Sequence, residues 1–416
     1  MIRDLASDAS TRVLIVSVFG HHGMARTPRA LKSAGFEVGL LANTDMAVAT
    51  TRFVDALFPL PRRVFREPSG KPVLRRILEV TDEWRPALII PGDEPTARLL
   101  HGALDLAEQG RLPMATHHLD QLAFALGTSR HRGAAVNKRA VQTLARQIGL
   151  RVPEFECVQT RAQAEMFAQR VGYPVVVKRD ATYGGHGVAL CTDRDSLREQ
   201  FEYQTVRAGR AKRLKDQLRK VARDELATVY HPADGRVTVQ RYIAGRPAMY
   251  TLAAVSGRMV AGFAAIAEHV HPEPFGPSTV VRLVRNDEME SMSRHLIAEL
   301  ACTGFAGIDF LLEDGTRTPY LLECNARPTP IAHLGSSVGV DLALALRRGL
   351  VNPAYAGPRQ AGDSERVVAL FPQEWRRDAS SPYLNLATHD VPWDDPQLVM
   401  GIAAETRSSH TYAKAA

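Results

Sequence analysis

The sequence predicts a parallel-sheet α/β domain followed by a larger α+β region. In the first third, short apolar strands alternate with helices, which is typical of right-handed βαβ units. From about residue 174, strands follow one another across glycine-bearing turns, which is typical of antiparallel hairpins. The chain has 416 residues, 45% of them hydrophobic, so it can bury the cores of two or three domains.

The N-terminal region, residues 1–115, is expected to be a Rossmann-like domain. Its expected elements are strands at 12–18, 36–42 and 87–90 and a helix at 25–34. Ligands of parallel sheets bind at the loops that follow the carboxyl ends of the strands. Polar residues in two such loops are therefore expected either near a substrate crevice or simply in solvent: His21, His22, Asp93 and Glu94.

The rest of the chain divides where the composition changes. We expect a connector at 116–136, a two-lobed α+β domain at 137–350 with a lid subdomain at about 174–240, and a C-terminal extension at 351–416. The expected helices span 137–148 and 289–302, and the expected strands span 174–178, 188–191, 237–242, 250–255 and 259–267. Prolines recur in the extension, so it is predicted to be rich in loops that pack back on the core.

One predicted hairpin gathers three oxygen ligands. Residues 307–312 and 320–327 are apolar strands joined by turn residues. Because side chains alternate along a strand, Glu323 and Asn325 share a face, which Asp309 on the partner strand can join. Two carboxylates and an amide suit a hard cation such as Mg²⁺, which takes phosphate oxygens as further ligands. The alternative is that these acids are solvated and have no role.

A glycine-rich turn follows Lys178. Residues 182–187 lie between two strands, and their glycines allow backbone N–H groups to approach phosphates closely. The turn is neither a Walker loop nor a dinucleotide fingerprint, because no Gly-Lys-Ser/Thr follows and the next element is a strand. Taken alone, it is more often a plain turn, and Lys178 a surface lysine.

The order of these motifs resembles that of the ATP-grasp superfamily, of the carboxylate-amine ligase type. Lys138 in a helix, the strand with Lys178, the glycine turn, the segment 239–245 and the hairpin follow one another as in that family. The resemblance covers residue 137 to about 350 and extends to the ATP-grasp domains of biotin carboxylase, carbamoyl phosphate synthase and L-amino acid ligases. It implies a fold in which two α+β lobes clasp ATP.

The resemblance implies a role for each matching residue. The positions that would contact the nucleotide are two lysines, three glycines of the lid and a hinge at the adenine edge. These residues are Lys138 and Lys178, then Gly184, Gly185 and Gly187, and then Gln240, Arg241 and Ile243. The ligands of Mg²⁺, for which Mn²⁺ can substitute, are Asp309, Glu323 and Asn325. The candidate catalytic residues are Lys178 and Arg327. The guanidinium of Arg327 is a planar fork of donors that suits an acyl phosphate or carboxylate. Pro247 departs from the family pattern at a position where many members hold the ribose with an acid.

The implied reaction is ATP-dependent ligation. Members of the family phosphorylate a carboxylate, and an amine then attacks the acyl phosphate, so ADP and phosphate are released. Two alternatives stay open: an enzyme that activates bicarbonate, as biotin carboxylase and carbamoyl phosphate synthase do, and a nucleotide-binding regulatory module without catalysis. The expected partners are a small carboxylate and a small amine, and a homodimer is compatible with the sequence.

Composition excludes several other classes. No apolar run reaches the ~20 residues that cross a bilayer, and residues 1–12 lack a secretory pattern, so a cytoplasmic protein is expected. The four cysteines have neither paired nor metal-type spacing. The net charge of +7 favours anionic ligands, but the basic segment 207–223 lacks the aromatics of a nucleic-acid reader. We read that segment as a solvated helix face.

Overall fold

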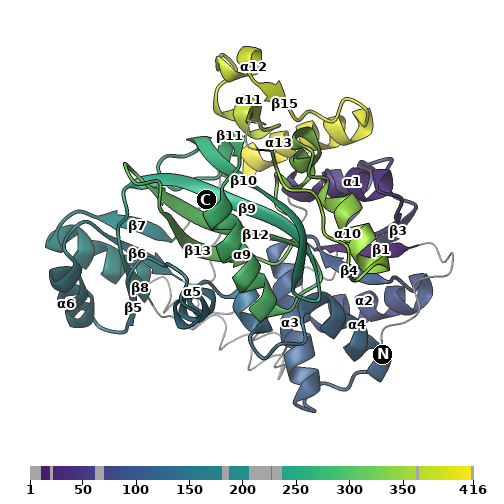
Figure 1. Cartoon of the computed structure of the whole chain (residues 1–416), viewed down its shortest axis with the longest axis horizontal. Coiled ribbons are helices and arrows are strands. Elements are labelled where there is room, and N and C mark those ends of the chain that lie inside the picture. The colour runs from purple at the N-terminus through teal and green to yellow at the C-terminus, as the bar shows by residue number, and fades with distance from the viewer. Residues whose placement is uncertain are drawn as a thin grey trace.

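The computed structural model describes residues 11–18, 22–60, 70–179, 187–205, 226, 237–361 and 365–413. Within these residues the chain forms three sheets: a four-stranded parallel sheet, a seven-stranded mixed sheet and a second four-stranded sheet (Figure 1). The predicted fold class, a Rossmann-like domain followed by α+β lobes, is confirmed. No helix in this part of the chain is long and apolar enough to span a bilayer.

The N-terminal sheet is wholly parallel, in the order β3-β2-β1-β4. Its strands are β1 (Arg12–Ser17), β2 (Glu37–Ala42), β3 (Ala56–Pro59) and β4 (Leu88–Pro91). The central strands β1 and β2 are apolar almost throughout because helices cover both faces of a parallel sheet. These helices are α1 (Thr27–Ser33), α2 (Lys71–Trp84), α3 (Glu94–Glu108) and α4 (Thr116–Leu126).

The seven-stranded sheet has the order β13-β12-β9-β10-β11-β14-β15 and is antiparallel except at its last pair. Its strands are β9 (Gly245–Val255), β10 (Arg258–Val270), β11 (Ser278–Val284), β12 (Gly304–Glu313), β13 (Pro319–Asn325), β14 (Arg366–Ala369) and β15 (Thr388–His389). Alternation along β9 assigns its side chains to two cores. Ala253 belongs to a core shared with the N-terminal sheet, whereas Leu252 and Ala254 belong to a core with α5 (Lys138–Gln147) and α9 (Asp287–Leu300).

The second four-stranded sheet is antiparallel, in the order β5-β8-β6-β7, and has a core of its own. Its strands are β5 (Phe155–Val158), β6 (Val175–Arg179), β7 (Val188–Cys191) and β8 (Val237–Arg241). Helix α6 (Arg161–Val171) packs on it and begins with a capping box between Thr160 and Gln163. In Figure 1 this sheet lies at the opposite side of the seven-stranded sheet from the N-terminal sheet.

The C-terminal residues pack against the N-terminal sheet and its helices. Beyond α10 (Leu342–Val351) they form α11 (Gln373–Arg377), α12 (Tyr383–Leu386) and α13 (Pro396–Ala413). Leu398 and Ile402 of α13 are buried in the core shared with the N-terminal sheet. The Arg26 guanidinium donates to the Phe371 carbonyl at 2.7 Å and lies 3.8 Å from the buried carboxylate of Asp390.

Several elements differ from the sequence-based expectation. The predicted connector is largely helical, since it contains α4 and the 3₁₀ helix Arg132–Val136. The extension holds the long helix α13, which begins at Pro396 because proline is well tolerated in the first helical turn. Gly184, Gly185 and the basic segment 207–223 lie outside the described residues. All four cysteines are free thiols.

Candidate active site

The hairpin β12–β13 brings the predicted metal ligands together. The strand register pairs Asp309 directly with Glu323 and Gly307 with Asn325. The Asn325 amide nitrogen donates to the Asp309 carboxylate at 3.2 Å. The shift of register after Asp309 places Phe310 opposite Leu321 and so leaves the pleat that holds the three polar side chains intact. The predicted hairpin and its shared face are therefore present.

The Lys138 ammonium completes this cluster. Lys138 is the first residue of α5, and the Asn137 side chain caps that helix by accepting from the Ala140 N–H at 2.9 Å. Because α5 packs against β13, the Lys138 Nζ reaches Oε2 of Glu323 at 2.7 Å. Burial lowers the pKa of Lys138, but the carboxylates of Glu323, Asp309 and Glu94 together raise it by more.

Lys178 adds a second positive charge from the neighbouring sheet. It lies near the end of β6, where burial and the charge of Lys138 lower its pKa to about 8, against the opposing effect of Glu323. Two ammonium groups at one site repel each other unless an anion lies with them. The pair is therefore suited to an anionic ligand such as a phosphate.

The two carboxylates of the hairpin are coupled. The side chains of Asp309 and Glu323 lie within hydrogen-bonding reach of each other. Burial and the charge of Glu323 raise the pKa of Asp309, whereas Lys138 brings the pKa of Glu323 down to about 2 in spite of burial. Two acids this close must share a proton or a cation. An all-oxygen pair of this kind fits Mg²⁺, provided that the Asn325 amide turns its oxygen toward Asp309.

Arg327 and Glu94 link the hairpin to the N-terminal domain. One Arg327 nitrogen donates to Oδ1 of Asn325 at 3.0 Å, and its Nε lies 3.6 Å from Oε2 of Glu94. Glu94 is the first residue of α3, which Asp93 caps by accepting from the Thr96 N–H at 2.9 Å. Asp93 is thus a buried structural residue, whereas Glu94 reaches the cluster. Sequence reasoning placed both near a crevice without separating these roles, although the Asp-Glu-Pro-Thr pattern of a capped helix contains the distinction.

The predicted hinge lies in the neighbouring sheet and not in the cluster. Gln240 belongs to β8 and is buried between Phe155 and Val176 on the adjacent strands. Arg241 is exposed at the end of β8, and Ile243 in the following turn is buried. Of the three lid glycines, Gly187 is described, and its positive φ of +79° explains why glycine is needed where β7 begins.

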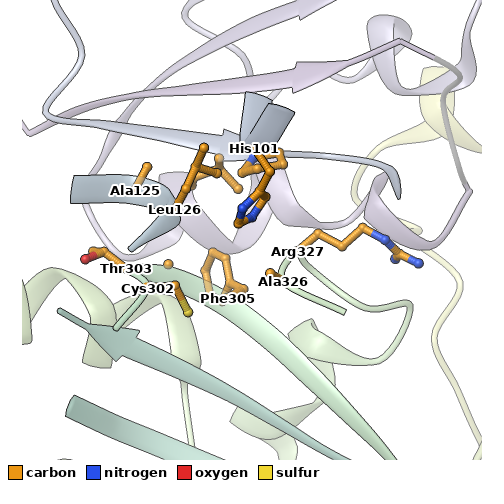
Figure 2. Close-up of a pocket in the computed structure, with 11 residues that line it drawn as sticks. His101, Ala125, Leu126, Cys302, Thr303, Phe305, Ala326 and Arg327 are labelled. Atoms are coloured by element: carbon orange, nitrogen blue, oxygen red, sulfur yellow. The ribbon is translucent and has the colours of Figure 1, made fainter. Parts of the chain in front are cut away.

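A small cavity lies behind the site, between α3, α4 and the start of β12. Its volume of ≈ 10 Å³ accommodates about one water molecule, so it is not a nucleotide site. Figure 2 shows the His101 ring directed into this space, while the Arg327 side chain extends away from it. Among the described residues neither ring nitrogen of His101 has a hydrogen-bond partner, and burial followed by the charge of Arg132 lowers its pKa to about 3. Sequence reasoning gave no sign of His101.

Comparisons with known proteins agree with this arrangement. A family model, the ATP-binding domain of the carbamoyl-phosphate synthase L chain, matches residues 137–218. The carbamoyl phosphate synthase large chain of Gemmatimonas aurantiaca is 24% identical over 357 residues, which is 83% of this chain and 28% of the relative. The chain spans under a third of the length of the curated relatives it matches.

Solved structures share the fold. The biotin carboxylase domain of Hydrogenobacter thermophilus 2-oxoglutarate carboxylase, a complex with MgADP, ADP and bicarbonate, superposes with a TM-score of 0.59 at 15% identity, over 86% of this chain and 73% of that one. The chain has the ATP-grasp fold. The L-amino acid ligase of Bacillus licheniformis superposes with a TM-score of 0.51 at 16% identity, over 83% of this chain and 75% of that one.

The ATP-grasp motifs extend beyond the family-model match. That match includes Lys138, Lys178 and the glycine turn but ends before Gln240 and the hairpin. For the hairpin residues and Arg327 the structure gives contacts with Lys138 and Glu94, and their roles stay a prediction. The resemblance to the ATP-grasp superfamily, drawn from the order of the motifs, is confirmed.

Proposed function

We propose that this ATP-grasp protein transfers the γ-phosphoryl group of ATP to a carboxylate and joins the resulting acyl phosphate to an amine. The observation that carries the proposal is the contact between Arg327 and Asn325 at 3.0 Å. It places a guanidinium fork, suited to a carboxylate, next to the residues suited to the metal and the phosphates. In that arrangement the acid and the γ-phosphate can meet within one site.

The roles of the site residues belong to this proposal. Asp309, Glu323 and Asn325 would hold Mg²⁺, or Mn²⁺ in its place, which neutralises phosphate charge during transfer. Lys138 and Lys178 bind phosphate oxygens, with Gly184, Gly185 and Gly187 above them. Gln240, Arg241 and Ile243 border the adenine, and Arg327 orients the acid. No protein nucleophile is needed, because positioning and charge neutralisation supply most of the rate.

The activated acid need not carry a carbon chain. Bicarbonate is named as a ligand of the Hydrogenobacter thermophilus structure, and a guanidinium fork binds bicarbonate through the same two oxygens as a carboxylate. We favour an organic acid. Arg327 pairs with Glu94 of the N-terminal domain, so the proposed acid site lies where two domains meet, and residues of both can contact a larger substrate. Small molecules are therefore the proposed partners, in a monomer or a homodimer.

An ADP-release screen tests the proposal. Amino acids, other carboxylates and bicarbonate are each crossed with amines in the presence of ATP and Mg²⁺. We expect ADP release that requires both an acid and an amine, and mass spectrometry should identify the amide. Release that depends on bicarbonate alone would instead assign carboxyphosphate chemistry.

Two variants connect the screen to the site. Glu323→Ala and Lys178→Ala should abolish substrate-dependent ADP release while circular dichroism stays unchanged. Near-normal turnover in both variants would contradict the assignment. ATP binding without turnover across the whole panel would favour a regulatory module.

A further inference from the structure

A second polar cluster lies on the N-terminal domain, away from the hairpin. Asp82 near the end of α2 and His117 and His118 in the first turn of α4 converge on one point. The Nε2 atoms of the two histidines lie 2.8 Å and 2.9 Å from the same carboxylate oxygen, Oδ1 of Asp82. The three ligand atoms all lie within 4.8 Å of one another. Asp82 lies 35 residues before the two consecutive histidines, and the packing of α4 beside α2 brings it to them.

We propose that Asp82, His117 and His118 form a binding site for a divalent transition-metal ion, with Zn²⁺ as the best-fitting ion. Two imidazole nitrogens and one carboxylate oxygen are a donor set that zinc commonly takes from proteins. Ligand atoms that each lie about 2 Å from a zinc ion are about 3 Å apart. The two oxygen–nitrogen distances of the cluster already have that size.

The cluster is partly preorganised. The His118 side chain is only 8% exposed, and its ring packs against that of His117 with centroids 4.0 Å apart. One turn further along α4, the Gln121 side chain donates to the Pro86 carbonyl just after α2, which fixes the same pair of helices. Asp82 and His117 are each 57% exposed and can adjust to the ion. One ligand is thus fixed, and the other two close around the metal.

The chemistry distinguishes this cluster from the hairpin. Imidazole favours zinc, copper or nickel over magnesium, whereas the oxygens of Asp309 and Glu323 favour Mg²⁺. Three protein ligands at an exposed position leave a fourth position for water. A bound ion would join α2 to α4, and the Thr303 N–H donates to the Ala125 carbonyl near the end of α4 at 3.0 Å. The site therefore braces the helix that meets the seven-stranded sheet.

Zinc titration tests the proposal. The intact protein is saturated with MgADP, titrated with Zn²⁺ in a calorimeter, and then gel-filtered for metal analysis. We expect one retained equivalent of zinc in the wild type and none in the double variant His117→Ala/His118→Ala. Zinc should also raise the melting temperature of the wild type but not that of the double variant. His295→Ala, which removes an exposed histidine of α9, is the matched control and should behave as the wild type.

Two results would overturn the proposal. One is a wild-type protein that retains no zinc. The other is equal retention by the wild type and the double variant, with circular dichroism showing both to be folded. A single variant, Asp82→Asn, guards against misfolding, because the exposed carboxamide keeps its shape but should weaken zinc binding at least tenfold. Unchanged affinity in Asp82→Asn would remove the carboxylate from the site and contradict the three-ligand assignment.

Discussion

Nε of Arg327 lies 3.6 Å from Oε2 of Glu94, so an ion pair joins a residue just beyond the hairpin β12–β13 to the first residue of α3. The distance is too long for a hydrogen bond, and the guanidinium therefore keeps donors for a ligand. Arg98 holds the other carboxylate oxygen of Glu94 at 3.0 Å from the next turn of α3. Arg98 thus fixes one oxygen of the Glu94 carboxylate, and the other oxygen faces Arg327.

Arg327 should be the most sensitive of these three positions. Arg327→Lys keeps the charge but loses the planar fork, and we expect turnover to fall about 100-fold with a smaller effect on the KM for ATP. Glu94→Gln should cause a smaller loss, because it only loosens the guanidinium. Steady-state ADP release measures both. Arg98→Ala is the control, and a loss there equal to that of Arg327→Lys would place the effect in α3 as a whole.

Asp309→Asn should separate stability from activity. Because burial and the charge of Glu323 raise the pKa of Asp309, folding favours a proton there that the unfolded chain does not hold at neutral pH. Asparagine removes this cost, so the protein without nucleotide should become more stable by about 1 kcal/mol. The same change removes a proposed metal ligand, and turnover should vanish at any Mg²⁺ concentration. Thermal unfolding and ADP release measure the two effects. A less stable variant with normal turnover would contradict the ligand role.

Removal of the metal should abolish turnover without unfolding the chain. Chelation with EDTA should stop ADP release, and excess Mg²⁺ should restore it, with Mn²⁺ as a weaker or equal substitute. Circular dichroism should not change, because the Asp309 and Glu323 carboxylates can share a proton when no cation is present. Activity that persists in EDTA would exclude a metal-dependent phosphoryl transfer.

His101 should make the fold sensitive to acid. Its folded-state pKa of about 3 lies below the ordinary value of 6.5, so on acidification the unfolded chain takes up a proton before the folded protein does. Stability should therefore fall as the pH drops below 6.5, by about 2 kcal/mol at pH 5 from this group alone. His101→Leu should remove that part of the pH dependence, whereas His295→Ala should not. Denaturant unfolding at pH 7 and pH 5 measures the difference.

Two arginines of the N-terminal domain each pair with an aspartate of the C-terminal segment, one pair buried and the other exposed. Arg26 is buried beside Asp390, whereas Arg29 pairs with Asp394 at 2.5 Å while about half exposed. Arg26→Ala removes the guanidinium beside a buried carboxylate, to which the His333 ring at 3.4 Å is the remaining basic neighbour, and should cost about 3 kcal/mol. Arg29→Ala should cost less than about 1 kcal/mol. Thermal unfolding distinguishes them, and equal losses would show that burial does not decide the strength of these pairs.

The local patterns of the sequence predicted much of the fold and the centre of the site. Alternation in the hairpin was enough to predict that Asp309 shares a face with Glu323 and Asn325, and the helix signal predicted Lys138 at the start of a helix. Strands β3, β5 and β11 were missed because β3 and β5 have only four residues each and β11 follows a proline-rich turn. Contacts between distant segments, such as Arg327 with Glu94, depend on tertiary packing that no local pattern specifies.

The division of the apolar cores has a consequence for how the molecule can move. One continuous core unites the N-terminal sheet with one face of the seven-stranded sheet, and α13 adds to it from the far end of the chain. The sheet that carries Lys178 and Gln240 has a separate core. Because that core is separate, we expect this sheet to move toward or away from the hairpin as one rigid unit. Separating this sheet from the hairpin for nucleotide exchange would then cost little more than the contacts between the two.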